Sequence, residues 1–214
     1  MNKKIIVVAL ITAFSAKAQI KEKSDIEISA IIGLTSSDFY GAPSASQFDP
    51  IYTPTFGINA DYYANNRWSL RLGVEYRTFG AKNEIFDGYV NRIFVAKQKL
   101  NYIFVPIHAN WHFGKNRNWN LNFGPSVSFL ESYSFNGTKG STENFTKGQI
   151  GLGLGIGYKF ELSEKFSIGI EHQEYISFMG ILKKEPYNSY YGNVGGGFNV
   201  RFIYNLNSQK KNQE

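Results

Sequence analysis

The chain contains no cysteine, which excludes disulfide bonds and a lipid anchor attached through cysteine. Methionine and proline are scarce, with two and six residues among 214. No stretch beyond the first residues approaches the ~20 apolar residues of a membrane helix. Glycine, tyrosine and phenylalanine are abundant instead, with 21, 14 and 18 residues, and this composition favours many packed strands over helices.

The N-terminus has the pattern of a secretory signal peptide. Met1 to Lys4 is basic, residues 5–15 are apolar, and Ala16-Lys17-Ala18 offers a cleavage site after Ala18. Removing residues 1–18 deletes three lysines, so the net charge falls from 23 − 17 = +6 to 20 − 17 = +3. We therefore expect export and no nucleic-acid partner.

The stretch "GQIGLGLGIGYKF" places glycine at every second position from Gly151 to Gly157. A GxGxxG nucleotide-binding loop would need glycine at position 156, which is Ile156. Period two is typical of a strand, because successive side chains face opposite sides. This strand would turn Leu152, Leu154 and Ile156 to one face and leave the other nearly bare.

Eight alternating segments cover residues 25–34, 53–64, 67–79, 99–113, 118–132, 146–160, 166–178 and 190–206. Short connections at 65–66, 114–118 and 162–165 alternate with long ones at 35–52, 80–98, 133–145 and 179–189. This layout predicts an all-β, eight-stranded antiparallel up-and-down transmembrane β-barrel with both termini in the periplasm. The barrel would occupy residues 19–206, and residues 207–214 would form a polar periplasmic tail.

The two faces of these strands differ in polarity. One face is rich in isoleucine, leucine, valine and phenylalanine, whereas the other collects four acids and four bases. A lipocalin would have an apolar interior, so this polarity predicts a lipid-facing exterior and a polar, plugged lumen. The predicted lumen charge network consists of Asp61, Arg71, Glu75, Arg77, Lys159, Glu171 and Arg201, with Glu27 as the fourth acid. Asn59, Asn101, Asn110, Asn120, Asn122, Gln173 and Asn199 are assigned to the same inward face.

A mutually neutralising plug is the preferred interpretation of these charges, because an unpaired buried charge is costly. A proton or ion path is the alternative, and a porin-type channel would need about 16 strands. The lumen of an eight-stranded barrel is only just filled by side chains. Glycines such as Gly153 and Gly195 would therefore make room for long side chains from across the barrel, such as Arg71 or Arg77.

Aromatic residues mark the short turns. Pairing like faces across each turn would place Tyr62 opposite Trp68, Trp111 opposite Trp119, and Phe160 opposite Phe166. All three tryptophans of the chain lie in these pairs. We interpret the six residues as an aromatic girdle at a membrane interface.

Three histidines are the candidates for chemistry. His108 and His112 share the inward face but lie about 13 Å apart along one strand, too far to share a metal. Alternation points His172 and Glu174 toward lipid, unless a bulge intervenes or the strand has reached the outer interface. Some eight-stranded barrels are lipid A deacylases with His and Ser two residues apart, whereas Ser177 lies five residues on and faces inward. We expect no catalytic residue, metal or cofactor.

The segments "LNYIFVPIHANWHFG", "NLNFGPSVSFL" and "GLGLGIGYKFELSEKFSIGIEHQEYISFMGIL" resemble the PorT-like outer-membrane β-barrel proteins common in Bacteroidetes. The resemblance covers nearly all of the chain after the signal peptide. It implies an eight-stranded barrel of the porin-family-like type in the cell outer membrane. One member of that family takes part in type IX secretion and gliding.

These patterns favour a non-enzymatic barrel with a structural or partner-binding role. A lipid A-modifying enzyme and a narrow passive channel are the alternatives. We expect a monomer in contact with outer-membrane lipid and lipopolysaccharide, through loop residues Lys82, Arg92, Lys97, Lys183 and Lys184. A protein partner would bind the extracellular loops or the periplasmic tail.

Overall fold

The computed structural model describes residues 21–41, 48–184 and 190–206. The predicted signal peptide, its cleavage site and the tail at 207–214 lie outside these residues. Within the described ranges, no helix is long and apolar enough to cross a membrane.

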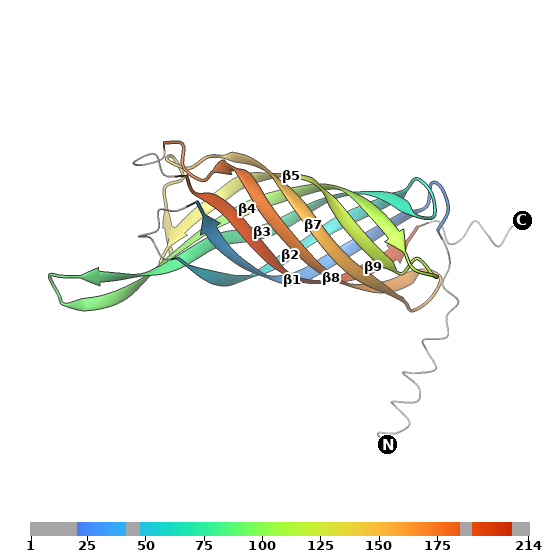
Figure 1. Cartoon of the computed structure of the whole chain (residues 1–214), viewed down its shortest axis with the longest axis horizontal. Helices are drawn as coiled ribbons and strands as arrows, with labels where there is room; N and C mark the ends of the chain where they lie inside the picture. The colour runs from blue at the N-terminus through green and yellow to red at the C-terminus, as the bar shows by residue number, and fades with distance from the viewer. Residues whose placement is uncertain (1–20, 42–47, 185–189, 207–214) are drawn as a thin grey trace, which may run out of the picture.

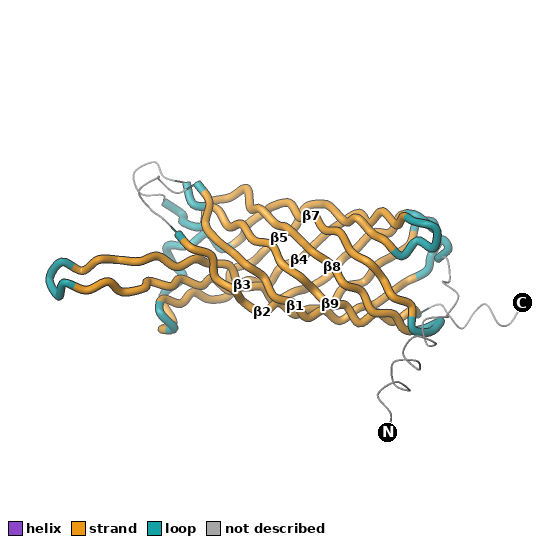
Figure 2. The backbone as a smooth tube through the Cα atoms, turned by 60° about the horizontal axis from the view of Figure 1, so that its bottom comes forward, coloured by secondary structure: helices purple, strands orange, loops and turns teal. Residues whose placement is uncertain are grey.

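Eight long antiparallel strands form a closed ring (Figures 1 and 2). They are β1 (Ile26–Tyr40), β2 (Asp49–Tyr63), β3 (Trp68–Asp87), β4 (Arg92–Phe113), β5 (Trp119–Phe135), β7 (Gly148–Glu161), β8 (Phe166–Gly180) and β9 (Gly192–Asn205). Consecutive ring strands pair with each other, and β1 pairs with β9 to close the ring. The short β6 (Thr138–Gly140) pairs antiparallel with the last residues of β5. The predicted eight-stranded antiparallel barrel is confirmed.

The register fixes the tilt of the strands. Directly paired residues can be followed once around the ring through Ile26, Tyr62, Leu70, Ala109, Phe123, Leu154, Glu174, Gly196 and Ser36. The line returns to β1 at Ser36, which is 36 − 26 = 10 residues beyond its start. This stagger corresponds to strands inclined by about 40° to the barrel axis.

Three short connections, at residues 64–67, 114–118 and 162–165, lie at one end of the barrel, here called the turn end. The opposite end, the loop end, differs from the prediction because its strands are longer. Residues 80–98 were expected to form a loop, but β3 and β4 continue to Asp87 and Arg92 and form a hairpin with a turn at 88–91. Similarly, β1 continues to Tyr40 and β2 begins at Asp49. The backbone ladder continues here although the alternation of apolar and polar residues has ended.

The predicted aromatic pairs are wrong by two residues, because the midpoint of each short turn lies one residue further along the chain than expected. Tyr62 lies opposite Leu70, Trp111 opposite Leu121, and Phe160 opposite Ile168. Asn65 Oδ1 accepts hydrogen bonds from the backbone N–H groups of Arg67 and Trp68, and Ser163 Oγ accepts one from Phe166. Such side-chain bonds to the backbone close tight turns. The shift is even, so the six residues of these pairs keep their predicted face.

The interior has two parts. The half near the turn end is polar, as predicted. The half near the loop end is apolar, with a buried cluster of Phe39, Phe79, Ala81, Leu100, Tyr102, Phe104, Leu130, Phe145, Tyr175 and Ile181. The predicted polar lumen therefore describes only the half near the turn end, because inward positions toward the loop end, such as Phe79, Tyr102 and Tyr175, carry aromatic residues.

The glycines of β7 make room for side chains, but not for the predicted arginines. A Cβ atom on Gly153 would lie 2.6 Å from His108 Cε1, and one on Gly155 would lie 2.8 Å from Asn122 Nδ2. A Cβ atom on Gly195 would lie 3.2 Å from Phe79 Cε1. The bare face of β7 therefore accommodates residues of its neighbour β5 and of β4, the next strand beyond β5 in the ring.

Candidate functional site

Two arginines and two carboxylates from four strands fill the middle of the polar lumen. Arg71 is completely buried, and its Nε donates to Asp61 Oδ1 at 3.0 Å while Nη1 donates to Glu171 Oε2 at 2.9 Å. Arg201 donates to Asp61 Oδ2, and its Nη1 lies 3.7 Å from Glu171 Oε2. The cluster is electrically neutral when all four groups are ionised.

A second ion pair lies where the polar lumen meets the apolar half. Arg77 Nε donates to Glu75 Oε2 at 2.7 Å, and its Nη2 donates to Gln173 Oε1 at 2.5 Å. The guanidinium carbon lies 4.3 Å from the centre of the Phe104 ring, so the cation also stacks on an aromatic face. Arg77 therefore joins the two halves of the interior.

A third group is located near the turn end and includes two residues absent from the predicted network. Lys159 Nζ and Lys21 Nζ lie 3.0 and 3.1 Å from the same oxygen of Glu27. The Tyr63 hydroxyl donates to the other Glu27 oxygen at 2.9 Å. Tyr63 shares the inward face of Asp61 and could have been found by alternation. Lys21 precedes β1 and carries no periodic signal.

A small cavity lies between the first and third groups. It is lined by His112, Asn120, Lys159, Glu171 and Arg201 and has a volume of about 10 Å³. A single water molecule needs roughly 10–15 Å³ of such volume. The described side chains therefore leave room here for about one water molecule and no more.

His108 and His112 serve separate hydrogen-bond networks. His108 lies 3.0 Å from Ser126 Oγ through Nε2 and 3.3 Å from Asn122 Oδ1 through Nδ1. His112 Nε2 lies 2.9 Å from Ser69 Oγ, and its ring stacks on Tyr63. In the described part of the chain, no three histidine, cysteine or acidic side chains form a metal-binding group.

Asn101 was assigned to the inward face, and this assignment is wrong. Its neighbours Leu100 and Tyr102 are fully buried inside the barrel, so Asn101 has the opposite orientation. It accepts a hydrogen bond from Thr78 and donates to Ser132, beside the irregularity where the register between β4 and β5 shifts. The side chain is half-buried at this bulge.

The apolar half of the interior is closed toward the loop end. Phe79 contacts Tyr102 and Tyr175 with ring centres 5.9 and 5.2 Å apart, and Phe104 contacts Tyr175 at 5.0 Å. Above them, Phe145 pairs with Leu182 in an isolated bridge between two loops. A polar plug and an aromatic plug therefore lie in series along the axis.

The six predicted girdle residues lie on the outer surface at the turn end. Tyr62, Trp68, Trp119 and Phe166 are exposed, while Trp111 and Phe160 are half-buried. Three further aromatic residues extend this set: Phe113, Tyr158 and Tyr204 stack on or pack against its members. The corrected strand pairing therefore leaves the aromatic girdle at the same height along the barrel axis.

His172 and Glu174 face outward, as alternation predicted. The pairing of β8 with β7 is regular from Ser167 to Ser177, so no bulge turns these residues. His172 Nε2 lies 2.7 Å from Glu174 Oε1. Ser177 is buried, accepts a hydrogen bond from Asn193 N and donates to Met179 O. The side chains of His172 and Ser177 therefore lie on opposite faces of β8, and the structure gives no support to a deacylase pair.

The hairpin of β3 and β4 projects beyond the other strands at the loop end (Figures 1 and 2). Its cross-strand pairs Phe86–Ile93 and Ile85–Phe94 occupy opposite faces, and all four side chains are exposed by 36–64%. The ladder between β2 and β3 stops at Lys82, and that between β4 and β5 stops at Gln98. Among the described residues, no strand covers either edge of the projecting part.

Comparisons with known proteins agree with this architecture. The neisserial surface protein A structure is 16% identical, with 84% of this chain and 96% of that one covered and a TM-score of 0.51. The outer membrane protein AlkL structure in lipid bilayers is 10% identical, with coverages of 89% and 94% and a TM-score of 0.52.

These identities support the barrel fold alone. No curated protein sequence matches the chain. The family described as "Outer membrane protein beta-barrel domain" matches residues 6–202, which is nearly the whole barrel. The protein is located in the outer membrane, and the chain belongs to the outer membrane protein beta-barrel domain family.

Proposed function

We propose that this protein is a non-enzymatic, sealed outer-membrane barrel that presents the β3–β4 hairpin to a protein partner at the cell surface. The observation that carries the proposal is the exposure of apolar side chains on both faces of the hairpin. An isolated two-stranded hairpin is at best marginally stable in water. Exposed apolar patches of this kind mark interaction sites.

The backbone of the hairpin supports the same function. Residues 83–87 and 92–96 have outer edges that no described strand covers, and such edges accept an added strand from a partner. Phe86 and Ile93 on one face and Ile85 and Phe94 on the other would then give side-chain specificity. The sealed interior favours a role for the outer surface over one for the lumen.

The resemblance to PorT-like proteins makes the type IX secretion machinery the first setting in which to seek this partner. A lipid A-modifying activity has less support, because Ser177, the nearest serine after His172 on β8, is buried on the other face. A passive channel has less support as well, because two plugs lie in series.

Site-specific photo-crosslinking in intact cells tests the proposal. We expect a photoreactive amino acid at Ile93 to yield a discrete crosslinked product. The same group at Lys139, in the short strand β6, and at Lys115, in a turn at the opposite end, serves as the matched control. With the photoreactive group kept at Ile93, Phe86→Ser combined with Phe94→Ser should abolish the product while the barrel stays folded. Equal products at all three positions, or none at Ile93, would contradict the proposal.

A further inference from the structure

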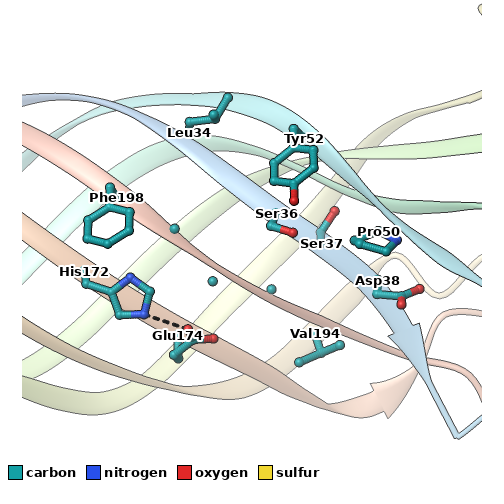
Figure 3. Close-up of a pocket in the computed structure, with 13 residues that line it drawn as sticks. Leu34, Ser36, Ser37, Asp38, Pro50, Tyr52, His172, Glu174, Val194 and Phe198 are labelled. Carbon is teal, nitrogen blue, oxygen red and sulfur yellow. Dashed lines mark hydrogen bonds and ion pairs between the residues drawn. The ribbon is translucent and has the colours of Figure 1, made fainter.

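A groove on the outer wall of the barrel has polar side chains where lipid is expected. It has a volume of about 530 Å³ and crosses β8, β9, β1 and β2. Glu174, Gly196, Ser36 and Tyr52 form one directly paired row across these four strands. Figure 3 shows His172 and Glu174 joined by their hydrogen bond, with Ser36 and Tyr52 at the other side of the groove.

Gly196 gives the groove its open floor. A Cβ atom at this position would lie 2.2 Å from both carboxylate oxygens of Glu174, so the carboxylate lies directly over the glycine and extends from β8 across β9. Any larger residue would displace it. The carboxylate therefore reaches toward Ser36, on the next strand.

The depth of the groove follows from the register. Ser36 lies ten residues beyond Ile26 on β1. At about 3.3 Å per residue and a tilt of about 40°, ten residues rise roughly 25 Å along the axis, which is about the height of the apolar band of such barrels. Ser36 and Asp38 thus lie at its outer limit, and Glu174, two strands earlier on the same rising line, lies about 6 Å deeper.

The groove is acidic at the top and apolar below. Its lining includes the carboxylates of Asp38 and Glu174 and contains no lysine or arginine. Leu34 and Phe198, which pair with each other, line the deeper part and are 54% and 66% exposed. A carboxylate on the lipid face is unfavourable unless a cation or hydrogen-bond donor reaches it. His172 reaches Glu174 Oε1, and the Phe39 N–H donates to Asp38 Oδ1, so a further donor would bind the second oxygen of each carboxylate.

We propose that this groove binds a membrane phospholipid whose headgroup ends in a primary ammonium. The ammonium would lie between Asp38 and Glu174, donating to their carboxylates and to the Ser36 hydroxyl, and an acyl chain would run down over Leu34 and Phe198. A lipid is the occupant because the groove opens on the membrane-facing wall of an outer-membrane barrel. An ammonium is the headgroup because it complements two carboxylates by charge and by its three N–H donors.

Native mass spectrometry tests this site with defined lipids. The purified barrel is equilibrated with equimolar dioleoyl phosphatidylethanolamine, phosphatidylcholine and phosphatidylglycerol in mixed micelles. We expect phosphatidylethanolamine to be retained about tenfold more than either competitor, as charge-assisted hydrogen bonds predict. The choline headgroup is cationic but has no N–H donor, so it separates hydrogen bonding from charge.

Two variants remove single carboxylates without changing side-chain size. Glu174→Gln and Asp38→Asn should each lower the preference for phosphatidylethanolamine toward that for phosphatidylglycerol, and Gly196→Leu should lower retention of all three lipids. Glu131→Gln alters an exposed carboxylate on β5 and should leave the preference unchanged. Two independent positions keep the test decisive if one variant assembles poorly. Equal retention of the three lipids by the unaltered protein, an unchanged preference in both variants, or a dimer crosslinked through Phe198 would overturn the proposal.

Discussion

Each residue of a barrel strand meets one of two environments, the lipid outside or the packed lumen inside. Leu72 and Arg71 are adjacent on β3, yet the first is 48% exposed and the second is completely buried. The direction of a side chain therefore decides what a substitution does. Two predictions at this scale use that contrast.

Leu72→Arg should lower the free energy of unfolding by about 2–4 kcal/mol, because it places a charge against hydrocarbon. Leu162→Arg, in the turn between β7 and β8, should cost about 1 kcal/mol or less, because charges near the interface stay hydrated. Urea-induced unfolding of the two variants in lipid vesicles measures the difference. Similar losses would mean that Leu72 does not face the lipid.

Arg71→Met should lower the free energy of unfolding by about 3–5 kcal/mol, the usual cost of breaking a buried ion pair. The substitution removes the cation that binds both Asp61 and Glu171. Arg67→Met changes an exposed residue in a turn and should have little effect. The same urea titration compares the two, and an equal stability of both variants would show that the ion pairs contribute nothing.

Alternation alone could assign most of these residues to a face, since a strand has period two. It could not identify ion-pair partners that come from strands far apart in the sequence, such as Arg71 and Glu171, 100 residues apart. Alternation could not predict the role of Lys21 either, for a different reason. It lies before the first strand, where no periodic pattern shows which way a side chain points.

The strands themselves were recognisable, but their ends at the loop side were not. Membrane-facing segments end where lipid ends, whereas the hydrogen-bonded ladder of β3 and β4 continues through Lys82, Glu84 and Arg92. From the sequence alone, these charged residues predict a loop. The aromatic half of the interior was missed for a different reason. Tyr102 and Phe104 lie within the expected strand 99–113 and alternate with His108 on its inward face, but the inward face was characterised by its charged and amide side chains alone.

Gly153→Ala tests whether β7 must stay bare on its inner face. The new Cβ would lie 2.6 Å from His108 Cε1, so we expect a loss of about 1–3 kcal/mol from overpacking. Gly148→Ala, at the start of the same strand, has no neighbour within 4 Å and should be nearly neutral. Adding His108→Ala should restore much of the stability of Gly153→Ala. If it restores none, the contact with His108 is not the cause.

On the scale of the whole molecule, closure and filling are separate properties. Eight strands with a stagger of ten give a ring with no free edge within the barrel, which the number of alternating segments predicted. The filling of the barrel interior could not be predicted in the same way, because it depends on which side chains meet across the ring. The polar plug was expected from its balanced charges, whereas the second, aromatic plug follows from contacts among Phe79, Tyr102, Phe104 and Tyr175.

The two plugs lie in series, and this arrangement determines what a conductance measurement should show. The unaltered protein in planar bilayers should give no stable single-channel steps, because the ion-paired section holds a cavity of only about 10 Å³. Glu75→Ala should destabilise the barrel by leaving Arg77 without its carboxylate. It should still not conduct, because the aromatic section remains closed above it. Large, steady steps from either protein would contradict the sealed lumen and make passive transport the better account of its function.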